Sequence, residues 1–208
     1  MILDIKEYFD IINRDVEKAY AVAQMARRKG YDPAPYVEIK PAPDLASRVE
    51  GIIGVEGIAD IIKDIGPEKT RPETAFEVVK RICNDNKFDM PLNKRLTLAV
   101  RAGLSVLTEG VLVAPTEGLQ GVEIHKNADG TSYIAVVYAG PIRGAGGTSA
   151  ALSVALADYA RKLFNIEVYK PSDTEVERNL EEIMLYHTRC ARLQYLPSDD
   201  NIRTIFKN

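Results

Sequence analysis

The residues best suited to chemistry form a glycine-rich stretch at Tyr138–Leu152, in which four glycines lie within eight positions: Gly140, Gly144, Gly146 and Gly147. Glycine lets the backbone adopt positive φ or approach a ligand closely. A glycine-rich turn that opens a helix also leaves N–H groups free, and these favour an anion such as phosphate. The pattern therefore predicts either a phosphate-binding turn or a tight turn that packs a helix on a sheet.

Few other residues offer chemistry. No motif places a nucleophile beside either histidine, so the sequence indicates no hydrolytic triad. A zinc site from two cysteines and two histidines is conceivable, yet only His187 and Cys190 have ligand-like spacing. The four residues are Cys83, His125, His187 and Cys190. We expect the two cysteines to be reduced thiols of an intracellular protein.

Composition limits the possible partners. The chain has 208 residues, of which 46% are hydrophobic and 27% charged, as in globular proteins. The net charge of −3 argues against wholesale capture of nucleic acid, so any such contact needs a local patch. No run of about 18 apolar residues occurs, and we therefore expect no membrane partner.

The first 30 residues are predicted to form one long amphipathic helix, from about Asp4 to Lys29. Apolar side chains recur there at three- and four-residue steps, and Gly30 follows as a C-cap. Such a stripe needs a partner surface. It could pack on its own domain, or residues 1–30 could form an arm that docks on another subunit or associates with a second copy.

A proline-rich linker is predicted at residues 31–44, where four prolines keep the chain out of helix: Pro33, Pro35, Pro41 and Pro43. A short extended segment is expected at Tyr36–Ile39. This stretch is the best candidate for a domain boundary.

Residues 45–108 are predicted to form a helical domain. Glycines interrupt an isoleucine-rich stretch from Asp44 to Gly66, which indicates two short helices with a tight joint. Thr70 and Glu73 have the spacing of a capping box that opens the next helix. A further helix, from about Leu92 to Thr108, carries a basic face that we expect to be solvated, formed by Lys94, Arg95 and Arg101.

Residues 109–208 are predicted to form an α+β domain. Strands are expected at 110–114, 121–126 and 131–138, with a hairpin turn at Asn127–Gly130, and an edge strand is possible at 166–169. His125 would lie exposed at a strand end. The glycine-rich turn would lead from the last hairpin strand into a helix capped by Thr148 or Ser149.

Two more helices are expected after this one. A capping box at Ser172 and Glu175 opens the first, and Ser198 caps the second. The first helix would place His187 and Cys190 on its buried stripe. The fold class is therefore α+β: an N-terminal helical region followed by a small antiparallel β-hairpin packed with long helices.

One interpretation of the glycine-rich turn follows from its chemistry. The segment from Pro141 to Ala151 resembles the phosphate loop of small-molecule kinases of the galactokinase and mevalonate kinase type. In that case residues 140–149 would bind ATP phosphate, with Thr148 and Ser149 facing phosphate and Mg²⁺. The order of elements differs from that family, because largely helical residues precede the first strand where those kinases begin with a β-rich domain.

A second resemblance covers the chain from about residue 5 to its end. Several stretches together are similar to the N-terminal region of the large subunit of the archaeal D-family DNA polymerase (DNA polymerase II). They are Tyr36–Lys40, Leu45–Gly51, Leu107–Gly110, Ala114–Gly118, Tyr138–Arg143, Ala145–Thr148, Ala151–Val154, Tyr169–Pro171, Glu181–Ile183 and Leu193–Ser198. A small departure is Gly144, where members tend to have serine.

This resemblance implies a non-catalytic front end of a heterodimeric DNA-directed DNA polymerase, a nucleotidyltransferase. The family's large subunit is several times longer, and its catalytic and metal-binding residues lie beyond this segment. The implied parent uses Mg²⁺, whereas no cofactor is expected within this segment. The implied partners are DNA and a small subunit with 3′–5′ exonuclease activity, in the archaeal cytoplasm at the nucleoid.

The resemblance also changes what the glycine-rich turn would bind. A DNA phosphate would be the anion, held by a set of backbone and side-chain donors in a contact that is independent of sequence. The candidate residues are Arg143, Gly144, Gly146, Gly147 and Thr148.

Overall fold

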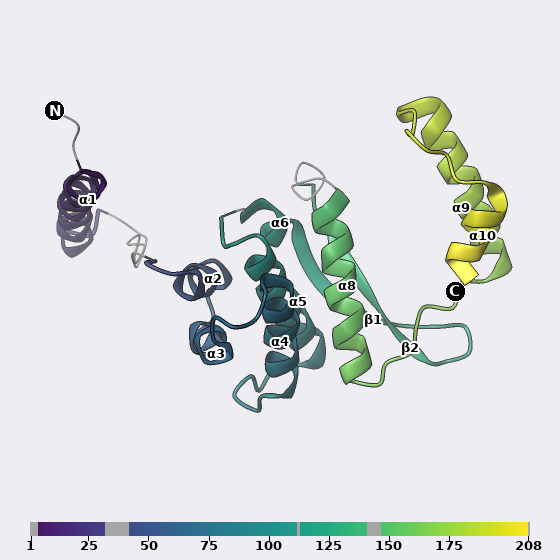
Figure 1. Cartoon of the computed structure of the whole chain (residues 1–208), viewed down its shortest axis with the longest axis horizontal. Coiled ribbons are helices and arrows are strands. Elements are labelled where there is room, and N and C mark those ends of the chain that lie inside the picture. Colours follow the sequence, from purple (N-terminus) through teal and green to yellow (C-terminus); the bar gives the residue numbers. More distant parts are fainter. Residues whose placement is uncertain (1–3, 32–41, 112, 141–146, 208) are drawn as a thin grey trace. The chain divides into compact units, whose positions relative to one another are not determined.

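The computed structural model describes residues 4–31, 42–111, 113–140 and 147–207. It divides into two compact units, Met1–Pro43 and Asp44–Asn208, and Figure 1 shows the order of the helices and strands. Most of the predicted linker, including the expected extended segment at Tyr36–Ile39, lies outside the described residues.

The smaller unit contains helix α1, Ile5–Arg28. Arg27 and Arg28 lie in its last turn, where cations interact favourably with the helix dipole, and Gly30 follows at a φ of 72°. The predicted amphipathic helix is confirmed, but no residue of α1 is buried. Its apolar stripe remains exposed, as the exposed fractions of Ile5 (74%) and Phe9 (55%) show.

The larger unit begins with the short helices α2, Leu45–Ile53, and α3, Ile58–Ile65. Gly54 and Gly57 join them in left-handed conformations, at φ of 71° and 96°. The Glu50 carboxylate accepts the N–H groups of Gly57 and Ala59, both at 2.9 Å. These bonds satisfy free donors at the start of α3 and fix the predicted joint.

Helices α4, Arg71–Asn84, and α5, Leu92–Leu107, form the centre of the larger unit. The predicted capping box opens α4, where Thr70 N–H donates to the Glu73 carboxylate at 2.8 Å. Helix α5 packs against α2, α4, α6, α8 and β1. Its side chains at Leu96, Val100 and Leu104 have no solvent exposure.

The predicted strand at 110–114 is wrong. Two left-handed residues, Glu109 and Gly110, follow the end of α5, and the short helix α6, Val113–Gly118, comes next. The buried hydroxyls of Ser105 and Thr116 lie 3.0 Å apart and hold α6 on α5. In the described sheet β1 and β2 pair only with each other, and residues 110–114 join neither strand.

The predicted hairpin is confirmed. Strands β1, Leu119–Lys126, and β2, Ser132–Tyr138, pair antiparallel, with Val122 opposite Val136. The turn closes through a bond from Asn127 N–H to the Thr131 carbonyl at 2.8 Å.

Residues 166–169 form no strand, so that expectation is wrong. The Asn127 side chain binds this segment instead, because its amide donates to the Val168 carbonyl and its oxygen accepts Lys170 N–H, both at 2.9 Å. Lys170 also pairs with Asp129 at 2.7 Å. Side chains, rather than a backbone ladder, therefore attach the segment to the hairpin turn.

Helix α8, Gly147–Leu163, lies against α5 and α4. Leu156, Ala157 and Ala160 enter the same hydrophobic core as α4 and α5, whereas Leu152 is 36% exposed. Residues from 45–108 and 109–208 thus share one core. The predicted boundary between those two regions stays a prediction.

The chain continues with α9, Asp173–Leu185, a π-helical turn η1, Tyr186–Cys190, and α10, Asp199–Lys207. Both predicted caps are present, at Ser172 and at Ser198. The expected burial of Cys190 is wrong, because this thiol is exposed. The π turn closes through a hydrogen bond from Ala191 N–H to the Tyr186 carbonyl. Because a π turn holds more residues per turn than an α-helix, Cys190 does not lie on the helix face on which Val176 and Leu180 are buried.

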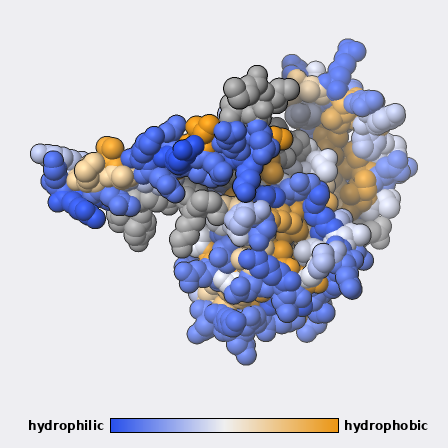
Figure 2. All heavy atoms as spheres, turned by 60° about the vertical axis from the view of Figure 1, so that its left-hand side comes forward, coloured by the Kyte–Doolittle hydropathy of each residue, from blue (hydrophilic) through white to orange (hydrophobic). Residues whose placement is uncertain are grey.

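The larger unit is mainly helical with one two-stranded antiparallel sheet, which confirms the predicted α+β class. Hydrophilic residues cover most of the face shown in Figure 2, and hydrophobic residues gather in smaller areas between them. That distribution agrees with a core enclosed by α2–α5, β1 and α8.

The packing around Gly103 generates a first prediction. A Cβ at this position of α5 would lie 2.9 Å from Val79 Cγ2 and 3.1 Å from Leu156 Cδ1. Overpacking costs about 1–3 kcal/mol, which exceeds the gain of ~1 kcal/mol that alanine brings to a helix. We therefore expect Gly103→Ala to lower the free energy of unfolding measured with urea.

Gly51→Ala is the matched control, since Gly51 lies in α2 with open space around the added Cβ. This variant should be stabilised by about 0.5–1 kcal/mol. Equal stabilisation of both variants would show that α5 is not closely packed at Gly103.

Candidate functional site

The structure describes only the two ends of the glycine-rich turn. Pro141–Gly146 lie outside the described residues, and with them the predicted site residues Arg143, Gly144 and Gly146. Gly147 is the first residue of α8, and Thr148 follows it; both are exposed, whereas Ser149 is buried. Thr148 and Ser149 lie inside α8, so the prediction that one of them caps this helix is wrong. At the position where the sequence predicts an anion, only the first two residues of α8 are therefore exposed.

Hydrogen bonds fix both flanks of the turn. The Tyr138 hydroxyl, at the end of β2, lies 2.7 Å from the Ser153 hydroxyl and donates to the Ala150 carbonyl at 3.2 Å. Ala139 N–H donates to the Gly118 carbonyl at 2.7 Å. The end of the strand and the first turns of α8 are thus joined, which is the geometry of a strand-to-helix corner.

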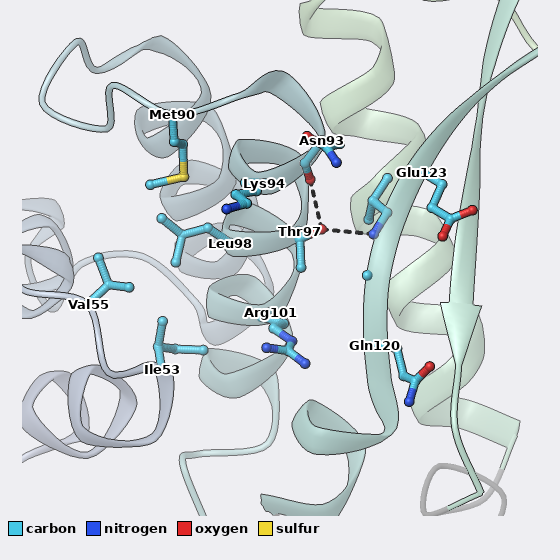
Figure 3. Close-up of a pocket in the computed structure, with 12 residues that line it drawn as sticks. Ile53, Val55, Met90, Asn93, Lys94, Thr97, Leu98, Arg101, Gln120 and Glu123 are labelled. Carbon is cyan, nitrogen blue, oxygen red and sulfur yellow. Dashed lines mark hydrogen bonds between the residues drawn. The ribbon is translucent and has the colours of Figure 1, made fainter.

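A second candidate site is a groove on the outer side of α5, with a volume of about 430 Å³. Lys94, Leu98 and Arg101 line it at steps of four and three along α5, so they lie on one side of the helix. Figure 3 shows these three side chains between two walls. One wall is Gln120–Glu123 of β1, and the other consists of Ile53, Val55 and Met90.

Thr97 holds the strand wall on the helix. Its hydroxyl accepts Val122 N–H at 2.8 Å and donates to the Asn93 carbonyl at 2.8 Å, as the dashed lines in Figure 3 show. Arg101 adds a second link, because its Nε donates to the Leu119 carbonyl at 2.9 Å. The outer edge of β1 is therefore bound to α5 at two points that border the groove.

The predicted basic face of α5 is divided between two environments. Lys94 and Arg101 face the groove, and neither makes an ion pair with any residue that the structure describes. Arg95 is half-buried and donates to the Cys83 carbonyl at 3.5 Å. The sequence predicted a basic face that is simply solvated, and this prediction is wrong for Arg95 and Arg101, which both bind backbone carbonyls. The seven-residue step from Lys94 to Arg101 is the signal that could have located the groove.

The four residues of the conceivable zinc site are not brought together. Cys83 is buried in the core, where loss of hydration raises the pKa of its thiol to about 11. His125 stacks on Tyr133 and pairs with Glu123 at 3.0 Å, and His187 Nδ1 accepts Leu193 N–H. Across the described ranges, no three side chains of the histidine, cysteine and carboxylate types gather in a way that could hold a metal ion.

Known proteins resemble this chain over nearly its whole length. A family model described as "DNA polymerase II large subunit DP2, N-terminal" matches residues 7–208. A DNA polymerase II large subunit from Methanosarcina barkeri is 47% identical over 99% of this chain. Those from Thermoplasma volcanium and Pyrococcus furiosus are 45% and 41% identical, over 100% and 99% of the chain.

The chain spans less than a fifth of the length of these relatives: 18%, 19% and 16%, respectively. No helix among the described residues is long and apolar enough to cross a membrane. The names of the relatives favour the polymerase resemblance over the kinase interpretation of the glycine-rich turn. Both the family model and the relatives cover almost every residue, and the chain therefore belongs to the family of the N-terminal region of the DNA polymerase II large subunit.

Proposed function

We propose that this chain is a structural and assembly segment of the large subunit of a heterodimeric archaeal DNA polymerase. The observation that carries the proposal is the family match over residues 7–208, together with relatives that are about five times longer. In this proposal the catalytic centre lies elsewhere in the large subunit. The segment contributes a rigid helical framework rather than reacting groups.

The parent enzyme would transfer nucleotides to a DNA primer, with Mg²⁺ ions stabilising the attacking and leaving oxygens. Its other subunit would be the small subunit that carries the 3′–5′ exonuclease. DNA would be the substrate, and the cytoplasmic nucleoid would be the place of action. In this proposal, no residue of the present chain takes part in nucleotide transfer or in exonuclease cleavage.

Within this function the glycine-rich turn contacts DNA phosphate. Thr148 is exposed in the first turn of α8, where backbone N–H groups lack helical partners. Arg143 precedes this turn in the sequence and would supply the cation. Such contacts position DNA without reading its sequence.

The contact is tested by Arg143→Ala in the assembled polymerase. We expect weaker binding to primer–template DNA for every sequence tested. The slope of log K against the logarithm of the salt concentration should also become shallower by about one. Fluorescence anisotropy across a salt series measures both. Arg178→Ala is the control, because Arg178 is an exposed arginine of α9 that pairs with Glu182 at 3.0 Å. An unaltered affinity and salt slope for Arg143→Ala would leave the turn purely architectural.

Helix α1 is proposed as an assembly arm, through docking on another subunit or self-association. Its apolar stripe is exposed in the described unit, and Tyr8 and Phe9 contact each other edge to face at 5.8 Å. Exposed aromatic residues of this kind are frequent anchors of protein interfaces.

Phe9→Asp tests the arm more sharply than deletion of residues 1–30. A charge in a desolvated interface should raise the dissociation constant of the assembly by roughly tenfold or more. Light scattering at several concentrations measures the mass. Glu17→Ala changes an exposed residue of the same helix and should leave the mass unchanged. If Phe9→Asp and the deletion both leave the mass unaltered, α1 is not an assembly arm.

A further inference from the structure

A second, larger hollow adjoins the groove on α5. Val55 and Met90 line both the α5 groove and a neighbouring cavity of about 830 Å³. The second cavity lies between α3, the end of α4 and the loop that leads to α5, with Phe88 and Ile61 in its lining. Val55 and Met90 thus border both hollows, and we call the two neighbouring hollows together the bipolar groove.

The charges at the two ends of the bipolar groove are opposite. Lys94 and Arg101 lie at the α5 end without an ion-pair partner among the described residues. The other end is mainly acidic, because five carboxylates line it against two cations, Arg81 and Lys87. Four of these carboxylates make no ion pair within the described ranges: Glu56, Asp60, Asp85 and Asp89. Glu123 also lines the α5 end, where it pairs with His125. The excess of charge is therefore positive at the α5 end and negative at the other end.

The middle of the bipolar groove is apolar. Val55 and Met90 are half-buried, and Leu98 lies beside them with 7% exposure. Figure 3 shows these side chains pointing into the space between Lys94 and the α2–α3 connection. Covering such a surface is favourable by about 25 cal/mol per Å², and a methionine adapts its shape to different apolar partners.

This pattern fits a polypeptide better than a nucleic acid. A DNA strand carries negative charge along its whole length, so the acidic end would repel it while the basic end attracts it. A polypeptide can carry a carboxylate at one end, apolar side chains in the middle and a basic group at the other. Only such a segment matches both ends of the groove.

A segment within the same polypeptide is the favoured occupant. The relatives extend the chain about fivefold, so most of the large subunit lies outside the 208 residues. A tethered segment has an effective concentration near the millimolar range. A shallow, partly polar groove therefore suffices for stable occupancy, as in contacts between domains of one chain.

We propose that the bipolar groove binds an acidic–apolar–basic segment of the same large subunit and so anchors this region to the rest of the polymerase. Carboxylates of that segment pair with Lys94 and Arg101, its apolar side chains cover Val55 and Met90, and its basic group faces Asp60 and Asp89. This inference rests on the proposed function, because it requires the longer large subunit.

Site-specific photo-crosslinking in the assembled two-subunit polymerase tests the proposal. p-Benzoylphenylalanine replaces Met90 in one sample and Val55 in another, and mass spectrometry maps the crosslinked peptides. We expect both positions to crosslink to one large-subunit segment outside these 208 residues. Lys94→Glu should reduce that yield about tenfold, which corresponds to ~1.4 kcal/mol of lost interaction.

Lys126→Glu is the matched control, because Lys126 is an exposed lysine of the hairpin whose amine donates to the Ser132 hydroxyl. It should leave the yield unchanged, and thermal unfolding should show that both lysine variants remain folded. Crosslinks to the small subunit alone or to DNA alone would overturn the proposal. So would no crosslink from either position, or a yield that Lys94→Glu leaves unchanged.

The failure of this inference can be told apart from the failure of the proposed function. A polymerase that assembles and extends primers without such a crosslink refutes the bipolar groove as an anchor and leaves the proposed function intact. A large subunit that shows no polymerase activity with its small subunit, primer–template DNA and Mg²⁺ refutes the function itself.

Discussion

Burial of α5 is the constraint on which the larger unit depends. This one helix contacts α2, α4, α6, α8 and β1, so each of those elements is placed by its fit to the same surface. The fit is close: Leu96, Val100 and Leu104 have no exposure, and Gly103 leaves no room for a methyl group beside Val79. Interiors packed at this density transmit a change at one position to all neighbours.

Polar side chains of α5 attach the hairpin to this helix. Thr97 and Arg101 satisfy backbone groups of β1 that a two-stranded sheet would otherwise leave open. The hairpin therefore stays on α5, and its second strand leads to the corner where α8 begins. The groove borders Gln120–Glu123, which lie near the open end of the hairpin, where Leu119 pairs with Tyr138 before the glycine-rich turn. Both features are thus consequences of one packing arrangement.

Local signals in the sequence predicted most elements, and long-range contacts account for the errors. The capping boxes at Thr70 and Ser172 and the turn at Asn127–Gly130 involve neighbouring residues, so their structures could be predicted correctly. The segments at 110–114 and 166–169 have strand-like composition, but contacts with residues distant in the sequence hold these regions in other conformations. Examples are the bond between Ser105 and Thr116 and the bond from Asn127 to Val168. The α5 groove is formed by residues that are far apart in the sequence, from α2 to β1. Of these residues, only Lys94 and Arg101 have a spacing that the sequence alone could have revealed. The sequence predicts that the glycine-rich turn connects a strand to a helix, and its two described flanks, β2 and α8, agree with this. The anion at the turn stays a prediction.

Native-state hydrogen exchange of the larger unit tests most directly whether α5 is the element on which the others depend. Amides of α5 between Leu96 and Val106 should exchange only through global unfolding, with the highest free energies of opening in the chain. Amides of α9 and α10, whose buried side chains are few (Val176, Leu180 and Ile202), should exchange earlier through local opening. Exchange of α5 by local opening, at free energies equal to or below those of α9 and α10, would contradict the account.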